Sequence, residues 1–109
     1  MLDVTFYKDS HDRLSSFLAS GHAGWADDGK DIVCAAVSAI LQAARLGLES
    51  YAAIPLMVKQ HKGELHLAWP ENARDDEALR AIVTTAELAV RQIAEQFPEH
   101  VRFHSSIAG

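Results

Sequence analysis

The sequence predicts an α+β fold in which two helices cover one face of a mostly antiparallel sheet. Short segments with apolar residues at every second position alternate with two longer segments whose apolar residues recur every three or four positions. The short segments occur in pairs around polar or glycine-containing turns, and strands joined by such hairpins pair antiparallel. The predicted order is β-β-α-β-β-α-β, for which a two-layer sandwich is the simplest arrangement.

Length and composition fit one domain over residues 1–109, long enough to bury a core without disulfides. Hydrophobic residues make up 49% and charged residues 23%, which is typical of globular proteins and argues against disorder. The longest apolar run is interrupted at Ser38 and Gln42, which argues against a membrane span. No basic stretch followed by an apolar stretch opens the chain, so we expect no secretory signal.

The first two predicted strands form a hairpin. Residues 2–7 alternate apolar and polar side chains, and the polar residues 8–12 form a turn. Residues 13–20 are ambiguous because Leu14, Phe17 and Leu18 have helical spacing. Eight residues between a turn and a glycine suit a hairpin strand better, so we expect a strand.

A glycine-containing loop over residues 21–30 precedes the first predicted helix. We expect Asp31 to be its N-cap, residues 32–46 to be helical and Gly47 to end it. The segment is apolar on almost all faces, which is typical of a helix that is mostly buried or packs against a second subunit.

Residues 53–60 and 64–69 are predicted to form a second hairpin around residues 61–63. Pro55 indicates a sheet edge or the start of a strand. After a charged loop over residues 71–76, a helix is predicted that Pro98 ends. Its apolar positions are Leu79, Ile82, Val83, Ala86, Val90, Ile93 and Phe97. The alternation that begins at Val101 predicts a last strand over residues 101–104.

Cys34 and His22 are the candidates for chemistry. Cys34 lies three residues into the predicted helix, where the positive end of the helix dipole favours a thiolate. His22, in the preceding loop, could take the thiol proton and later protonate a leaving amine. The free N–H groups at the start of the helix could stabilise an oxyanion. These are the parts of an acyl-transfer site.

The same residues also have structural interpretations. A lone cysteine in an apolar helix is most often a small buried side chain. Ser38, one turn after Cys34, could face the same site or bond its own backbone, and Trp25 could face substrate or plug the core. His66 and His104 could share a sheet face, but zinc needs three or four converging ligands, so we expect no metal and no cofactor.

Charge and cysteine content exclude some functions and leave others open. The net charge of −5 disfavours nucleic-acid binding and is compatible with a positively charged partner. The single cysteine excludes an internal disulfide and suits a cytoplasmic location. A binding module with an inert thiol remains an alternative. A redox protein is a weaker one, because the chain has no resolving cysteine.

The segment GHAGWADDGKDIVCAAVS, residues 21–38, resembles the signature of the Prp family of ribosomal-processing cysteine proteases. That signature is GHA, a variable loop containing glycine, and then G-x-DIVCAAVS. The resemblance extends over essentially the whole chain in length and element order. It implies a small cytoplasmic bacterial protein with an α+β fold, usually homodimeric. It also implies an activity, removal of a short N-terminal extension from large-ribosomal-subunit protein number twenty-seven.

By position in the motif, the resemblance makes Cys34 the nucleophile and His22 the base. Asp31 matches an acidic residue next to this dyad, which either orients His22 or caps the helix. The segment over residues 21–30 matches a loop that closes over substrate. Its notable members are Gly21, Gly24, Trp25 and Gly29.

Overall fold

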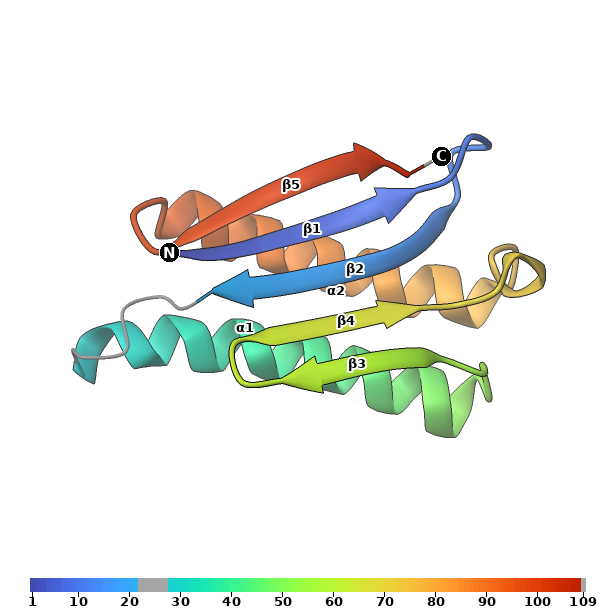
Figure 1. Cartoon of the computed structure of the whole chain (residues 1–109), viewed down its shortest axis with the longest axis horizontal. Coiled ribbons are helices and arrows are strands. Elements are labelled where there is room, and N and C mark those ends of the chain that lie inside the picture. Colours follow the sequence, from blue (N-terminus) through green and yellow to red (C-terminus); the bar gives the residue numbers. More distant parts are fainter. Residues whose placement is uncertain (22–27, 109) are drawn as a thin grey trace.

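The computed structural model describes residues 1–21 and 28–108, without the side chains of residues 28–31, and confirms the predicted α+β fold (Figure 1). Its five strands are β1 (Leu2–Lys8), β2 (Leu14–Gly21), β3 (Met57–His61), β4 (Glu64–Ala68) and β5 (Val101–Ile107). Its helices are α1 (Asp28–Leu46) and α2 (Glu77–Gln96), with a π-helical turn η1 (Gly47–Tyr51) and a 3₁₀ turn η2 (Glu71–Ala73).

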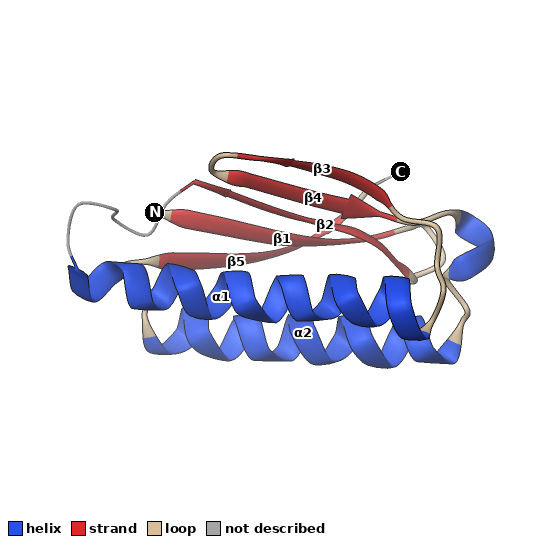
Figure 2. Ribbon diagram, turned by 90° about the horizontal axis from the view of Figure 1, so that it is seen from below, coloured by secondary structure: helices blue, strands red, loops and turns tan. Residues whose placement is uncertain are grey.

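The strands form one sheet in the order β3-β4-β2-β1-β5. Every neighbouring pair is antiparallel except β1 and β5, which run parallel. Both helices lie on the same face of the sheet (Figure 2). The parallel pair arises because α2 crosses back along that face before the chain enters β5, as a connection between parallel strands must.

Alternation along the strands places the core between the sheet and the helices. In β1, Leu2, Val4 and Phe6 are buried, and the ring of Phe6 lies 5.3 Å, centroid to centroid, from that of Phe17 on β2. The buried positions of α1 and η1 are Val33, Val37, Leu41, Ala44 and Leu48, three or four residues apart. Helix α2 buries a similar stripe. The ambiguous segment at residues 13–20 is a strand, as predicted.

The expected start of the first helix is wrong and its expected end is confirmed. Helix α1 begins at Asp28, so Asp31 lies inside its first turns and cannot be the N-cap, and Gly29 is helical. Its last residue is Leu46, as predicted, but Gly47 does not turn the chain away, because it begins the π-helical turn η1. A Cβ atom at Gly47 would lie 3.2 Å from Cδ1 of Ile82 on α2, so this glycine allows close packing against α2.

The second hairpin begins later than predicted. Residues 53–56 are not part of β3, because Ala53 takes a left-handed φ of 54° and Ile54 donates its N–H to the carbonyl of Leu48 at 2.9 Å. The chain therefore folds back onto the end of the helix before the strand starts. The edge position indicated by Pro55 is confirmed for β3, which stands at one end of the strand order that the structure describes. Strand β5 is longer than predicted and pairs with β1 as far as Ile107.

One helical stretch, Ile32–Tyr51, is long and apolar enough to cross a membrane by length and composition alone, despite the polar interruptions. This is weak evidence for a span, because core helices pass the same test. In the fold the buried stripe of this stretch packs against the sheet. Only 28% of its most apolar 18-residue segment is buried inside the protein. An apolar helix face is therefore left exposed.

Candidate active site

Cys34 is a partly buried residue of α1 that lines a cavity of about 160 Å³ at one end of the sheet. The cavity is bounded by the start of β1, the end of β2 and the turn between β3 and β4, together with one face of α1. Its lining residues are Leu2, Ala19, Gly21, Cys34, Val37, Ser38, Leu41, Gln42, Gln60, His61, Gly63, Glu64 and Leu65. The thiol thus lies beside a space that could receive part of a ligand.

Gly21 ends β2 at the edge of this cavity, directly before His22 in the sequence. Its φ of 92° lies in the left-handed region, which favours glycine. A Cβ atom here would collide with the backbone carbonyl oxygen of Met1. The N–H of Gly21 donates to the carbonyl of Gly63 at 2.9 Å, which ties the end of β2 to the β3–β4 turn.

The bounds of α1 change the electrostatic expectation for Cys34. Cys34 is the seventh residue of the helix and not the third, about 9 Å along the axis from Asp28. In a helix only the first four N–H groups lack an intrahelical partner, and the dipole effect falls off within the first turn. The start of the helix is therefore too far away to be the main source of thiol activation or of an oxyanion hole.

The cavity has an apolar floor and a polar rim. The floor consists of buried side chains, Leu2, Ala19, Val37, Leu41 and Leu65. On the rim, Nε2 of His61 lies 2.9 Å from Oε2 of Glu64, and Nη1 of Arg45 donates to Oε1 of Gln60 at 3.0 Å. Sequence reasoning missed Gln60, His61 and Glu64, because the pairing of β3 with β4 and of β4 with β2 brings them to Cys34.

The structure brings together some of the predicted site residues. Gly21 and Ser38 line the same cavity as Cys34, and Ser38 is exposed one helical turn further along. Gly29 lies in α1. His22, Gly24 and Trp25, and the side chain of Asp31, lie outside the described residues.

His66 and His104 do share the outer face of the sheet, but they are far apart. The pairings His66 with Leu18, Leu18 with Thr5 and Thr5 with His104 place them in one row across four strands. Three strand spacings separate them by about 14 Å, too far to bind one metal ion together. Over residues 1–21 and 28–108, no group of three or more potential ligand side chains converges on a metal site.

Nε2 of His104 instead lies 3.0 Å from Oδ1 of Asp3, which Arg102 also contacts. The hydrogen bond to His104 lowers the pKa of Asp3, against the opposing effect of burial, and Arg102 adds to the lowering. This group forms a surface ion network on the outer face of the sheet, away from the helices and from Cys34.

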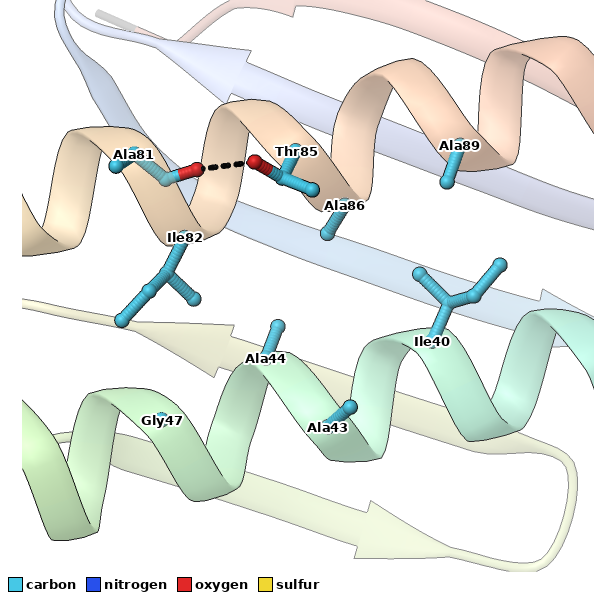
Figure 3. A pocket seen from close by; sticks show the side chains of 9 residues that line it. All are labelled: Ile40, Ala43, Ala44, Gly47, Ala81, Ile82, Thr85, Ala86 and Ala89. Atoms are coloured by element: carbon cyan, nitrogen blue, oxygen red, sulfur yellow. Dashed lines mark hydrogen bonds between the residues drawn. The ribbon is translucent and has the colours of Figure 1, made fainter.

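A larger groove, of about 460 Å³, lies between α1 and α2 (Figure 3). None of the described residues that line it is titratable, and the hydroxyl of Thr85 among them donates to the carbonyl of Ala81 at 2.7 Å. The described lining of this groove therefore offers no acid, base or nucleophile, whereas the smaller cavity is lined by the Cys34 thiol.

Comparison with known proteins identifies the fold and the family of this chain. A search of proteins with curated descriptions found no match. Among solved structures, SMU.848 from Streptococcus mutans is 28% identical, with a TM-score of 0.84 over 99% of this chain and 96% of that one. An essential ribosomal processing protease Prp from S. aureus, solved with a covalently linked product peptide, is 20% identical, with a TM-score of 0.86. The same protease with a substrate peptide gives 0.84, and both alignments cover 96% of this chain and 99% of the other.

Because the two S. aureus structures are only 20% identical to this chain, their similarity shows the fold alone. The family itself is shown by the sequence model of cysteine protease Prp, which matches residues 1–102. That match includes the motif around Cys34 and nearly the whole sheet and helix layer. The resemblance seen in the motif is thereby confirmed, and the chain belongs to the Prp family of cysteine proteases.

Proposed function

We propose that Cys34 is the nucleophile of this protease and His22 its general base. A cysteine protease attacks its substrate through a thiolate, and Cys34 is the only cysteine in the sequence. The observation that carries the proposal is that this one thiol lines a cavity and is not sealed in the core. His22 follows directly on Gly21, which lines the same cavity.

The proposed reaction proceeds through a thioester. His22 takes the proton from Sγ of Cys34, and the sulfur attacks the carbonyl carbon of the scissile peptide bond. As the C–N bond breaks, the imidazolium gives its proton to the leaving amine. His22 then deprotonates a water molecule that attacks the thioester, which releases the carboxylate product and restores the thiol.

We propose that most of the thiol activation comes from the imidazole of His22. The positive end of the helix dipole lies at Asp28, more than one turn away. Since Asp31 cannot be the N-cap of a helix that begins at Asp28, we propose that it orients His22.

We propose as substrate the N-terminal extension of large-ribosomal-subunit protein number twenty-seven, cleaved in the cytoplasm. The structurally similar S. aureus protein is a ribosomal processing protease whose structures hold product and substrate peptides. The net charge of −5 also complements a basic ribosomal protein. Residues 21–27 connect the cavity edge to α1, and we propose that Gly24 and Trp25 contact the substrate.

The test is cleavage of the purified precursor, followed by mass spectrometry of its N-terminus. Cys34→Ala should abolish cleavage and leave the circular dichroism spectrum unchanged, since alanine is a good helix former. His22→Ala should lower kcat/KM by about 10² to 10⁴, whereas Ser38→Ala, on the same cavity, should retain cleavage. Cleavage by the Cys34→Ala protein would overturn the proposal. A wild-type protein that binds the precursor without cutting it would favour a binding module.

We also propose that two copies associate through the outer face of the helix layer. Ile32 is 71% exposed and Leu46 is 64% exposed, at the two ends of α1. Between them, exposed alanines recur every four residues, at Ala35, Ala39 and Ala43. This stripe borders the uncharged groove between α1 and α2 (Figure 3). A two-fold related copy would cover a continuous apolar surface.

A further inference from the structure

We propose that Glu64 determines which substrate side chains the Cys34 cavity accepts, by favouring basic side chains over acidic ones. The inference deepens the proposed function and rests on it, because it assumes that a substrate side chain next to the scissile bond enters this cavity. It names a specificity-determining residue that lies on the β3–β4 turn, outside the sequence motif that contains Cys34 and His22.

The first supporting observation is the charge of the cavity wall. Among the described residues that line the cavity, Glu64 has the only carboxylate, and none is lysine or arginine. Lys62 at the tip of the same turn and Lys59 on β3 do not line the cavity. Arg45 on α1 does not line it either: its guanidinium donates to Gln60 at 3.0 Å and is paired with the carboxylate of Glu49 at 3.2 Å. The other polar lining side chains are neutral amides or hydroxyls, apart from the Cys34 thiol and the His61 ring.

The second observation is that Glu64 is fixed at the rim. His61 and Glu64 are cross-strand partners at the β3–β4 turn, and their side chains meet at 2.9 Å. The Glu64 side chain is 37% exposed, against 66% for His61, so the carboxylate is the more enclosed partner. A charge held in one place and partly enclosed is screened less than one on an open surface.

The third observation is the size and shape of the cavity. Its volume of about 160 Å³ is close to that of an apolar cavity that holds one benzene ring. It therefore has room for one side chain, whose stem would lie on the apolar floor and whose tip would reach the rim. Lysine and arginine have long aliphatic stems that cover apolar surface while the charged end stays in water.

The experiment uses peptides from the precursor's cleavage site in which each position beside the scissile bond is set in turn to lysine, norleucine or glutamate. At one position, kcat/KM of the wild type should be about tenfold higher for lysine than for glutamate at low salt, which corresponds to about 1.4 kcal/mol. Glu64→Gln should reduce this ratio to less than about threefold at that position only. Glu64→Lys should invert the ratio.

Glu99→Gln is the matched control, because Glu99 is exposed in the turn after α2 and does not line the cavity. Its ratio of kcat/KM for the lysine peptide to kcat/KM for the glutamate peptide should equal that of the wild type. If Glu64→Gln keeps the wild-type ratio while Cys34→Ala abolishes cleavage, the inference is overturned and the proposed function stands.

A binding measurement separates failure of the inference from failure of the proposed function. Fluorescence anisotropy with the Cys34→Ala protein should give tighter binding of the lysine peptide than of the glutamate peptide. Absence of any cleavage by the wild type would contradict the proposed function, and equal affinities of the two peptides would independently overturn the inference. If Glu64→Gln has a lowered Tm, the deciding measurement is the ratio of kcat/KM for the lysine and glutamate peptides in Glu64→Lys. An inverted ratio supports the inference, and a wild-type ratio overturns it.

Discussion

Asp9 is a buried carboxylate at the end of β1 opposite to the Cys34 cavity, and it joins two distant parts of the chain. It accepts hydrogen bonds from the backbone N–H groups of His11 at 2.8 Å and Arg13 at 3.1 Å, within the β1–β2 turn. It also contacts the side chains of Arg13 and, 65 residues further on, Arg74, whose Nη1 lies 3.0 Å away. This single side chain therefore fixes the turn to the segment that leads into α2.

We expect Asp9→Asn to remove an acid-sensitive part of the stability. Burial alone would raise the pKa of Asp9. The backbone N–H of Arg13, the side chain of Arg74, the backbone N–H of His11 and the charge of Arg13 outweigh burial and lower the pKa to about 2. Because the pKa in the folded state lies below the ordinary value of 3.8, the carboxylate stabilises the fold above about pH 4. That stabilisation is lost as the pH falls from about 4 to about 2.

The measurement is Tm as a function of pH. Asp9→Asn should lower Tm at pH 7 and flatten its fall between pH 4 and pH 2. The control is Asp12→Asn in the same turn, where an 87% exposed carboxylate makes only a 3.7 Å pair with Lys8. Identical pH profiles for wild type and Asp9→Asn would show that the cluster does not hold the turn.

At the residue scale, the sequence predicts the nucleophile candidate but not its surroundings. Cys34 and Ser38 are one helical turn apart, so local spacing alone places them on one face. Glu64 and His61 approach Cys34 only through the pairing of β2 with β4 and of β3 with β4. No local pattern encodes such a contact, which is why reasoning from the sequence missed both residues.

At the scale of elements, the end of β2 depends on a glycine. We expect Gly21→Ala to cost about 2 kcal/mol, because alanine at a φ of 92° is strained and its Cβ would collide with the carbonyl oxygen of Met1. The displaced strand end would also disturb the hydrogen bond to Gly63 that frames the cavity. Chemical denaturation should show the lost stability, and kcat/KM should fall at least about tenfold.

Gly47→Ala is the matched control for that prediction. Gly47 has no positive φ, and its Cβ would meet the Ile82 side chain, with one tight contact of 3.2 Å to the terminal Cδ1. The gain in helix propensity, about 1 kcal/mol, offsets the small shift that Ile82 must make. We expect activity like that of the wild type and a stability within about 1 kcal/mol of it. If Gly21→Ala matched Gly47→Ala in both measurements, the end of β2 would not need glycine.

Gly47 also shows why the ends of helices and strands were harder to predict than their presence. Apolar spacing identified both helices and most of the strands, because it reflects the buried face. For β2 the spacing was helical, and the short length between a turn and a glycine identified the strand. The ends of the first helix were assigned from Asp31 and Gly47, which are common local signals for a cap and a stop. In the fold, packing against α2 explains Gly47, and the helix starts a turn before Asp31.

At the scale of the whole molecule, the chain leaves one apolar surface uncovered. The sheet buries one face under both helices, and the outer face of the helix layer carries exposed Ile32, Leu46 and Leu88 with the groove between α1 and α2 (Figures 2 and 3). Periodicity predicted an almost uniformly apolar helix but could not tell which side remained exposed. A contiguous apolar surface of this kind is typical of an interface.

We expect the protein to be a dimer at micromolar concentration, with a mass by light scattering of twice 11.9 kDa. Leu46→Glu should give folded monomers with an unchanged circular dichroism spectrum, because Leu46 is 64% exposed and contributes little to the core of one chain. Ile107→Glu is the control. It changes a 74% exposed residue on β5, at the sheet edge opposite to β3, and should stay dimeric. A monomeric wild type, or a Leu46→Glu protein that remains dimeric, would show that copies do not meet through α1.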